Sequence, residues 1–403
     1  MAQNPSSSVQ PPEPNLMVLE NRWLHKVFVF ISSFDQLPKL LNWLLLLGLI
    51  GLHYGLWYRV APQLAPPMTA ILAWAMGVDL ALLWLLPRRR ISFGRVPSQF
   101  IGLAAPRLGV SAASLLLAPW QPQAALLGMV ALQTAGVVVY LWAMLVEPHR
   151  LAMTTLHLTT PHLPAGTDPV RLLHLSDLHV ERLTGREEKL LALIEAARPD
   201  LIVITGDYLN LSYTRDPEAI AQVRSLLSKI NAPFGVYATL GSPPVDVADV
   251  APLHFSQSHI RLLRADLLEV DLGPGRRLAL LGLDCSHDMA YDAHRLAALD
   301  GRRNGRLPTV LLYHSPELMP AAQQYEIDLF LCGHTHGGQV RVPGYGAIVT
   351  SSVTGKRYEM GRYDENGTTL YVSRGVGLEG MCAPRLRLFC PPELTLVVLG
   401  GRE

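Results

Sequence analysis

Six side chains of the types that bind divalent metal ions occur in four short motifs, SDLH, GDY, YHS and GHTH. They are Asp177, His179, Asp207, His314, His334 and His336. Carboxylate oxygens and neutral imidazole nitrogens together suit ions such as Mn, Fe or Zn. Two such ions about 3.5 to 4 Å apart can clamp a phosphoryl group and acidify a water molecule. The residue types therefore indicate a site for two divalent metal ions and the hydrolysis of a phosphate ester.

Each motif taken alone also has an ordinary structural interpretation. Asp-x-His after a strand arises by chance, GDY can be a turn, and a single His314 can be a hydrogen-bonded core residue. The segment GHTHGG is more specific, because glycines flank two histidines that a tight turn can direct to one point. The occurrence of all four motifs in one chain favours the metal site over these alternatives.

The segments that must position the motifs form an α/β pattern from Val170 onward. Four apolar strands lead directly into the motifs, namely VRLLHL, LIVIT, PTVLLYH and DLFLCGH. Helices are predicted near residues 186–197 and 217–230. Ligands in α/β sheets gather at the carboxyl ends of strands, so this placement supports a common site. After His336, the strands GQVRVP, LYVSRG, RLRLFC and LTLVVL lack intervening helices, which predicts a second, largely antiparallel sheet packed on the first.

The first part of the sequence has the composition of a membrane region. Apolar segments lie near residues 40–58, 66–86, 101–120 and 124–146, and each approaches the ~20 residues that cross a bilayer. Asp79 and Arg107 fall inside the second and third segments. We assign Asp79 no function and expect it to form a hydrogen bond between helices, and the third segment can span if Arg107 extends to a membrane interface. Transport has little support, because these two charges make no polar pathway.

Basic residues in short loops predict the orientation of this region. Arg88, Arg89, Arg90 and Arg95 lie between the second and third segments, and such loops face the cytoplasm. We therefore expect a multi-pass protein of the cell membrane, whose C-terminal domain is cytoplasmic unless the third segment fails to span. The expected division is a flexible or interfacial segment at 1–38, about four transmembrane helices at 39–147, and a soluble domain at 148–403.

Composition also argues against several classes of protein. The formal net charge is +1 and the soluble part has no basic run interleaved with aromatics, so a nucleic-acid partner is disfavoured. The cysteines, Cys285, Cys332, Cys382 and Cys390, have no CxxC spacing and are expected to be reduced thiols. The sequence gives no indication of the oligomeric state.

The motifs resemble those of the calcineurin-like metallophosphoesterase superfamily, in particular its membrane-tethered bacterial branch. The resemblance covers roughly residues 171–399 and is carried by LHLSDLHVERLT, DLIVITGDYLN, LLYHSPEL and LCGHTHGGQVRVP. It implies a four-layer α-β-β-α sandwich of two mixed sheets. It also implies that Asp177, His179 and His336 bind the first metal, that Asp207 bridges, and that His314 and His334 bind the second.

The sequence departs from the family where an Asn and a His are expected. Ser242 and Pro243 occupy these positions. A Ser hydroxyl is a weaker ligand than an Asn amide oxygen, which predicts a weakened second metal site, and Pro243 cannot protonate a leaving group. Asp246 could substitute as a ligand, although a solvated loop acid is expected there. Four further histidines, His174, His254, His259 and His287, match no motif and are expected to be surface or packing residues.

Two functions remain open from the sequence. One is a membrane-anchored phosphoesterase acting on phosphate mono- or diesters, lipid-linked ones included, with a metal-bridging hydroxide as nucleophile and with activity impaired at Ser242 and Pro243. The other is a catalytically inactive relative that binds metal or a phosphorylated ligand and regulates a membrane partner. Membrane lipids are expected neighbours in both.

Overall fold

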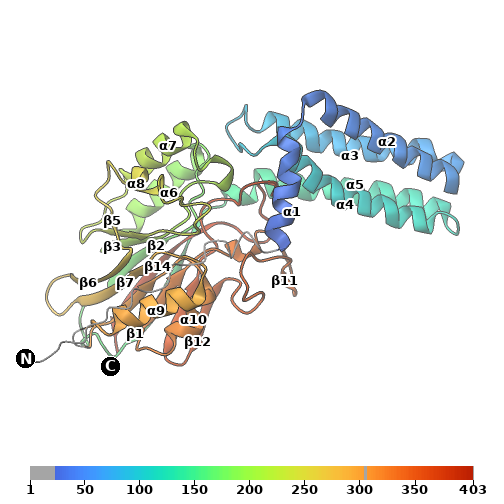
Figure 1. Ribbon diagram of the computed structural model, residues 1–403. Helices are drawn as coiled ribbons and strands as arrows, with labels where there is room; N and C mark the ends of the chain where they lie inside the picture. Colours follow the sequence, from blue (N-terminus) through green and yellow to red (C-terminus); the bar gives the residue numbers. More distant parts are fainter. Residues whose placement is uncertain (1–22, 304–305, 403) are drawn as a thin grey trace, which may run out of the picture.

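The computed structural model describes residues 23–303 and 306–402 of the chain (Figure 1). Residues 1–22 of the predicted flexible or interfacial segment at 1–38 therefore lie outside the described residues. The first helix, α1 (Trp23–Ser32), runs across the following helices rather than along them. Those helices are α2 (Lys39–Val60), α3 (Ala65–Leu85), α4 (Val96–Leu117) and α5 (Pro122–Leu145).

Helices α2 to α5 lie side by side as a bundle next to the α/β part of the molecule. Within the described residues, four helical segments are long and apolar enough to cross a membrane, by length and composition. Many of their large apolar side chains face outward, including Leu47, Leu56 and Leu127. Such exposed apolar side chains fit a transmembrane bundle, in which lipid rather than water surrounds the helices.

The expectation that Arg107 extends to an interface was wrong. Its side chain is buried and donates from Nε and Nη2 to Asp79, at 3.0 and 2.8 Å. Asp79 therefore forms a hydrogen bond between helices, as expected, although the sequence did not identify Arg107 as its partner. The physical reason is that α3 and α4 pack side by side, and a charge inside an apolar bundle is stabilised by an opposite charge.

The strands of the described chain form two sheets of six strands each. The first has the order β1-β14-β2-β3-β4-β5, comprising β1 (Ala152–Thr160), β14 (Glu393–Gly401), β2 (Val170–Leu175), β3 (Leu201–Thr205), β4 (Val236–Thr239) and β5 (Arg261–Leu262). The second has the order β12-β13-β9-β8-β7-β6, comprising β12 (Gly361–Glu365), β13 (Thr368–Val372), β9 (Leu329–Cys332), β8 (Thr309–Leu312), β7 (Arg277–Leu283) and β6 (Ala265–Asp271). A small hairpin joins β10 (Arg341–Val342) to β11 (Gly346–Ala347).

The two sheets pack face to face, and helices cover their outer faces. A buried cluster that includes Val203, Leu280 and Leu331 joins the sheets. Helices α6 (Gly185–Ala197), α7 (Pro217–Leu227) and the short α8 (Ala251–His254) pack on the first sheet, while α9 (Met289–Asp300) and α10 (Met319–Ala322) pack on the second. The inner strands β3, β8 and β9 are buried, largely apolar runs because both faces of the sheets are covered there. The predicted four-layer α-β-β-α sandwich is confirmed.

The prediction for the strands after His336 was wrong in detail. They do not form a separate, largely antiparallel sheet: β12 and β13 extend the second sheet, and β14 lies between β1 and β2 of the first. The segment RLRLFC forms no strand beyond an isolated bridge from Leu388 to Val340. Its two arginines are buried and donate hydrogen bonds to fixed oxygen atoms. Arg385 donates to the Glu181 carboxylate and Arg387 to backbone carbonyls, and these contacts accompany an irregular backbone.

This irregular segment also joins the α/β part to the bundle. The backbone N–H groups of Arg385 and Arg387 donate to the Gln99 side chain of α4 and to the Ala143 carbonyl of α5, at 3.1 and 3.0 Å. The Cys390 N–H donates to Glu147, just beyond α5, at 3.0 Å. The helices are thus hydrogen-bonded to a loop that also reaches the ligand motifs, since Cys390 Sγ lies 3.1 Å from the His336 carbonyl oxygen.

Candidate metal centre

The six predicted ligands follow four strands of the two sheets. Asp177 and His179 follow β2, Asp207 follows β3, His314 follows β8, and both His334 and His336 follow β9. Strands β2 and β3 are parallel to each other, as are β8 and β9, so each pair delivers its motifs to one edge. All six side chains are buried. The structure therefore brings together the residues that the motifs singled out.

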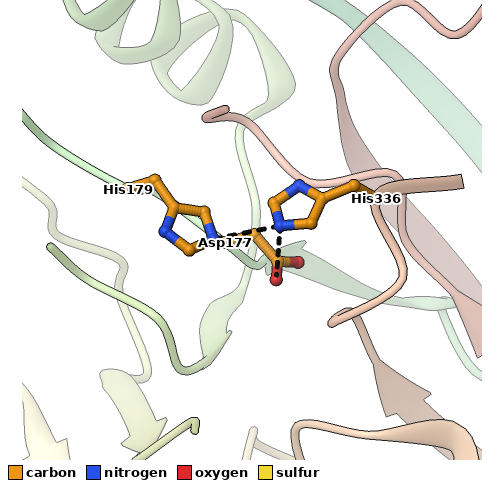
Figure 2. A group of neighbouring side chains, drawn as sticks. All are labelled: Asp177, His179 and His336. Atoms are coloured by element: carbon orange, nitrogen blue, oxygen red, sulfur yellow. Dashed lines mark hydrogen bonds and ion pairs between the residues drawn. The ribbon is translucent and has the colours of Figure 1, made fainter. Parts of the chain in front are cut away.

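The six residues form two adjoining groups of three, and the potential ligand atoms within each group lie within 4.8 Å of one another. The first comprises Asp177, His179 and His336, drawn in Figure 2. The second comprises Asp207, His314 and His334. Asp207 Oδ2 lies 3.6 Å from His179 Nε2 and 3.2 Å from His314 Nε2, which places one carboxylate oxygen between the groups.

The donor set fits divalent cations. His179 Nε2 and His336 Nε2 are 3.0 Å apart, and two imidazole nitrogens at this distance repel unless a proton or a cation lies between them. Among the described residues, the buried His334 Nε2 has no hydrogen-bond partner. Imidazole nitrogens combined with carboxylate oxygens are ligands of Mn, Fe and Zn. The residues present are therefore those that such an ion requires.

The backbone around the ligands is unusual. Five of the six occupy positive φ, with values of 51° for Asp177, 41° for His179, 57° for Asp207, 70° for His334 and 51° for His336. Residues other than glycine rarely adopt this region, and they cluster at functional sites when they do. Gly333 permits the close approach of two of these loops, because a Cβ there would lie 2.0 Å from Asp177 Oδ2.

Comparison with known proteins agrees with this geometry. Residues 170–242 match the family model described as calcineurin-like phosphoesterase. The chain is 30% identical over 264 residues to the uncharacterized metallophosphoesterase YkuE of Bacillus subtilis, covering 64% of this chain and 89% of that protein. The chain belongs to the calcineurin-like phosphoesterase family.

Two further members of the phosphoesterase family are similar to this chain. Phosphodiesterase YaeI of Escherichia coli is 30% identical over 244 residues, which are 57% of this chain and 82% of that protein. UDP-2,3-diacylglucosamine pyrophosphatase LpxG of Chlamydia trachomatis is 25% identical over 314 residues, which are 65% of this chain and 93% of that protein. The predicted resemblance is thereby confirmed, and hydrolysis of phosphate esters is the activity that the family implies.

In this member of the family, backbone carbonyls orient two of the histidines. Nδ1 of His179 lies 3.2 Å from the Leu209 carbonyl oxygen, and Nδ1 of His314 lies 2.7 Å from that of Thr205. A proton on each Nδ1 donates to these carbonyls and leaves the Nε2 lone pair directed at the carboxylates. Such contacts fix ring orientation and raise the basicity of a metal-binding histidine.

The electrostatics of the candidate metal centre favour a cation. Burial lowers the pKa of His314, but Asp207 and Asp177 outweigh burial and raise it to about 10. Burial raises the pKa of Asp177, whereas burial lowers the pKa values of His334 and His336. Without a metal ion, a proton on His314 therefore balances the carboxylates. A divalent cation would supply that positive charge instead.

The loop that departs from the phosphoesterase motif lies against the second group. The Ser242 N–H donates to Asp207 Oδ1 at 2.7 Å, and Ser242 Oγ lies 3.5 Å from His334 Nδ1. The expectation that Asp246 is a solvated acid was wrong. It is buried and accepts hydrogen bonds from the N–H groups of Asp207, Tyr208 and Gly241, at 2.8, 3.0 and 2.7 Å. Asp246 thus holds the ligand loops together instead of facing the metal site.

The four histidines that the motif comparison left out of the candidate metal centre have different environments. His174 is buried against Thr205 and His254 against Tyr208, as packing residues, and His259 is exposed. His287 is buried as well, but it lies beside a proposed ligand, with its ring centroid 4.7 Å from that of His334. It follows β7, which is parallel to β8, so its position at a strand end was a usable signal that the motif comparison passed over.

Proposed function

We propose that this protein is a membrane-anchored, metal-dependent phosphoesterase that hydrolyses phosphate mono- or diesters. Its two divalent cations, of Mn, Fe or Zn, would be held by Asp177, His179, Asp207, His314, His334 and His336. The observation that carries the proposal is the convergence of two buried ligand groups on Asp207 Oδ2. Family membership supports the same reaction class.

Residues around the proposed metal centre orient Asp207 and determine which leaving groups are favoured. When bound, a pair of divalent cations polarises the phosphoryl group and lowers the pKa of a water molecule. Asp207 Oδ1 accepts the Ser242 N–H, which leaves Oδ2 directed at both ligand groups. Pro243 has no proton to donate, so substrates whose leaving oxygen needs little protonation are favoured.

Exposed apolar side chains near the site support a substrate at the lipid surface. Val342, Tyr345, Ile348, Val349 and Val353 are exposed in the segment that follows the GHTHGG motif. In Figure 1, β11 within this segment lies on the side of the sandwich nearest α1 and the bundle. Trp23 and Phe30 of α1 are exposed as well. Exposed apolar patches of this kind mark interaction with membranes or partners.

We therefore extend the proposal to phosphate or pyrophosphate esters that carry a lipid moiety. The relative LpxG is named for a diacylated sugar nucleotide, which is a substrate of this class. Anchoring raises the effective concentration of such lipids around the site relative to soluble esters. Activity on soluble esters alone, with lipid-linked ones untouched, would contradict this part of the proposal.

The topology is part of the same proposal. We place four spans at residues 39–147, a cytoplasmic phosphoesterase domain at residues 148–403, and the protein in the cell membrane. Arg88, Arg89, Arg90 and Arg95, in the connection between α3 and α4, support a cytoplasmic position for that loop. Because α3 and α4 are consecutive spans, α5 would then return the chain to the cytoplasmic side.

The experiment that tests the function uses the full chain purified in detergent and supplied with manganese. Hydrolysis of bis(p-nitrophenyl) phosphate, whose leaving group is good, and of a diacylated sugar-nucleotide pyrophosphate would be measured for the wild type and for Asp207→Asn. We expect turnover in the wild type and its loss in the variant. A wild-type protein that binds manganese but turns over neither substrate would favour the second candidate, a regulatory metal-binding protein, to which the Ser242–Pro243 sequence points.

A further inference from the structure

His287 lies beside Ser242, the position at which the second group of ligands lacks the amide oxygen expected from the family. It follows β7, and the parallel arrangement of β7, β8 and β9 delivers it to the same edge as His314 and His334. Its Nε2 lies 3.2 Å from Ser242 Oγ, the hydroxyl that stands where the family has an amide oxygen. The imidazole of His287 therefore lies, together with that of His334, next to Ser242, where the proposed second metal ion would lack an amide ligand.

The surroundings of His287 are those of a metal-binding histidine. Its Nδ1 lies 3.4 Å from Glu317 Oε2, with both side chains essentially buried. Glu317 is held in turn, since its Oε1 accepts from Val353 N–H at 2.7 Å and from the Ser352 hydroxyl at 3.1 Å. A carboxylate on one ring nitrogen fixes the tautomer and leaves the other nitrogen as the ligand. Here that other nitrogen is the one beside Ser242.

Two further observations connect His287 with the six ligands. The potential ligand atoms of His287, Glu317 and His334 lie within 4.8 Å of one another, so His334 belongs both to this group and to the group of Asp207 and His314. His287 also has a positive φ of 60°, the backbone conformation that five of the six proposed ligands adopt. Its backbone is therefore constrained in the same way as theirs.

We propose that His287 is a ligand of the second metal ion, replacing the amide oxygen that is absent at Ser242. This inference rests on the proposed metal centre. Asp207, His314 and His334 supply three ligands to that ion, and an imidazole nitrogen is a better donor to Mn, Fe or Zn than a Ser hydroxyl. The substitution at Ser242 is then compensated from a different loop, and the second ion is retained.

The test compares two substitutions of His287, one that leaves no atom at the Nε2 position and one that places an amide oxygen there. His287→Asn keeps an N–H donor near the position of Nδ1, facing Glu317, but places no atom at Nε2. His287→Gln extends to the position of Nε2 and offers an amide oxygen there. Ions bound per full-length chain in detergent would be counted by elemental analysis after dialysis against manganese, and the affinity would be measured by calorimetry.

We expect two ions in the wild type, loss or a roughly 10- to 100-fold weakening of one ion in His287→Asn, and a smaller effect in His287→Gln. Adding Ser242→Asn to His287→Asn should restore the second ion, because it returns the family's own ligand. His254→Phe, which replaces a buried histidine outside the site, is the matched control and should keep both ions.

Three results would overturn parts of the account, and they are distinguishable. Two ions bound with native affinity in His287→Asn would overturn the role of His287 as a ligand and leave the proposed function intact. Retention of both ions with loss of turnover would assign His287 to the substrate instead, which also contradicts the inference. A wild type that binds no ion would remove the metal centre itself, and both proposals with it.

Discussion

Asp79 and Arg107 form a buried ion pair that joins α3 to α4, with contacts of 2.8 and 3.0 Å. Gln133 of α5 completes the group, because its carbonyl oxygen accepts from Arg107 Nη1 at 2.9 Å and its side chain donates to the Arg107 carbonyl at 2.9 Å. Three helices of the bundle are therefore connected by polar contacts inside apolar surroundings. This arrangement satisfies the charges locally, which fits an anchor better than a transport pathway.

Breaking this ion pair on one side should destabilise the bundle strongly. Arg107→Leu leaves the Asp79 carboxylate buried and uncompensated, for which we expect a cost of about 3–5 kcal/mol. The double variant Asp79→Leu/Arg107→Leu removes both charges and should recover most of that loss. Thermal unfolding of the full chain in detergent measures both. A double variant no more stable than Arg107→Leu would contradict the pairing.

Gly333→Ala should damage the site without changing any proposed ligand. An added Cβ would lie 2.0 Å from Asp177 Oδ2 and 2.1 Å from Ser176 Oγ, so Asp177 must move. Displacing a group in an active site by about 1 Å costs on the order of 100-fold in rate, and we expect a loss of that size in turnover. Gly185→Ala is the control, since nothing lies within 4 Å of its added Cβ. Equal activity of the two variants would refute the close approach.

Removal of metal ions should lower the stability of the sandwich. The ligands bring like groups together, such as the nitrogens of His179 and His336 at 3.0 Å, and a bound cation relieves their repulsion. Binding of an ion at 100 times its dissociation constant stabilises the folded state by about 2.7 kcal/mol. Melting temperatures with manganese and with a chelator provide the measurement. Identical values, in a protein shown to bind manganese, would speak against this linkage.

Acidification should destabilise the protein partly through His254. The ring is buried at the end of α8, neither nitrogen has a hydrogen-bond partner among the described residues, and burial lowers its pKa to about 4. In the unfolded chain its pKa is about 6.5, so the unfolded state binds more protons as pH falls through that value. Stability is thus full above pH 6.5, and about 2 kcal/mol is lost by pH 5.

The variant His254→Phe tests this assignment, because it fills the space with a side chain that does not titrate. Melting temperatures of the wild type and of His254→Phe would be compared at pH 7 and pH 5. The wild type should lose more stability than the variant between these pH values. If both lose the same amount, the acid sensitivity arises from other groups.

Restoring the family sequence at the departing loop should increase turnover. Ser242→Asn adds an amide oxygen beside His334 while keeping the backbone N–H that binds Asp207. Pro243→His adds a group that can protonate the leaving oxygen, an effect worth roughly 10² to 10⁴ in rate. We expect the largest gain for alkyl esters, whose leaving groups are poor. Initial rates on alkyl and nitrophenyl esters measure it, and a gain equal for both would argue against leaving-group protonation.

The sequence predicted the convergence of the motif residues better than it predicted the pairing of distant elements. Asp177, Asp207 and His334 could be assigned to one location because each follows an apolar strand, and strand ends share an edge in an α/β sheet. His287 follows the same rule but belongs to no family motif, so comparison by motif excluded it. Its proposed role depends on Glu317 and Ser242, and no local pattern in the sequence shows that these three residues meet.

Long-range contacts account for the other errors. Arg107 was expected at an interface because no partner for its charge could be identified from the sequence, which does not show which helices are neighbours. The structure pairs it with Asp79 of the adjacent helix. Asp246 was expected to be a solvated loop acid, yet three backbone N–H groups converge on its carboxylate. The last strands were assigned to a separate sheet because no helices lie between them in the sequence. The order of strands in the sequence does not, however, determine their order in a sheet. In each case the deciding contact joins segments far apart in the chain.

The position of β14 has a consequence for how the protein is made. This strand is the last of the two sheets to be synthesised, yet it lies between β1 and β2, pairing parallel to one and antiparallel to the other. On the ribosome, the helices of the bundle emerge and can insert into the bilayer long before the first sheet can close. The first sheet can therefore be completed only after the bundle helices and nearly all of the α/β part have been synthesised, so its closure is a late step in the formation of the structure.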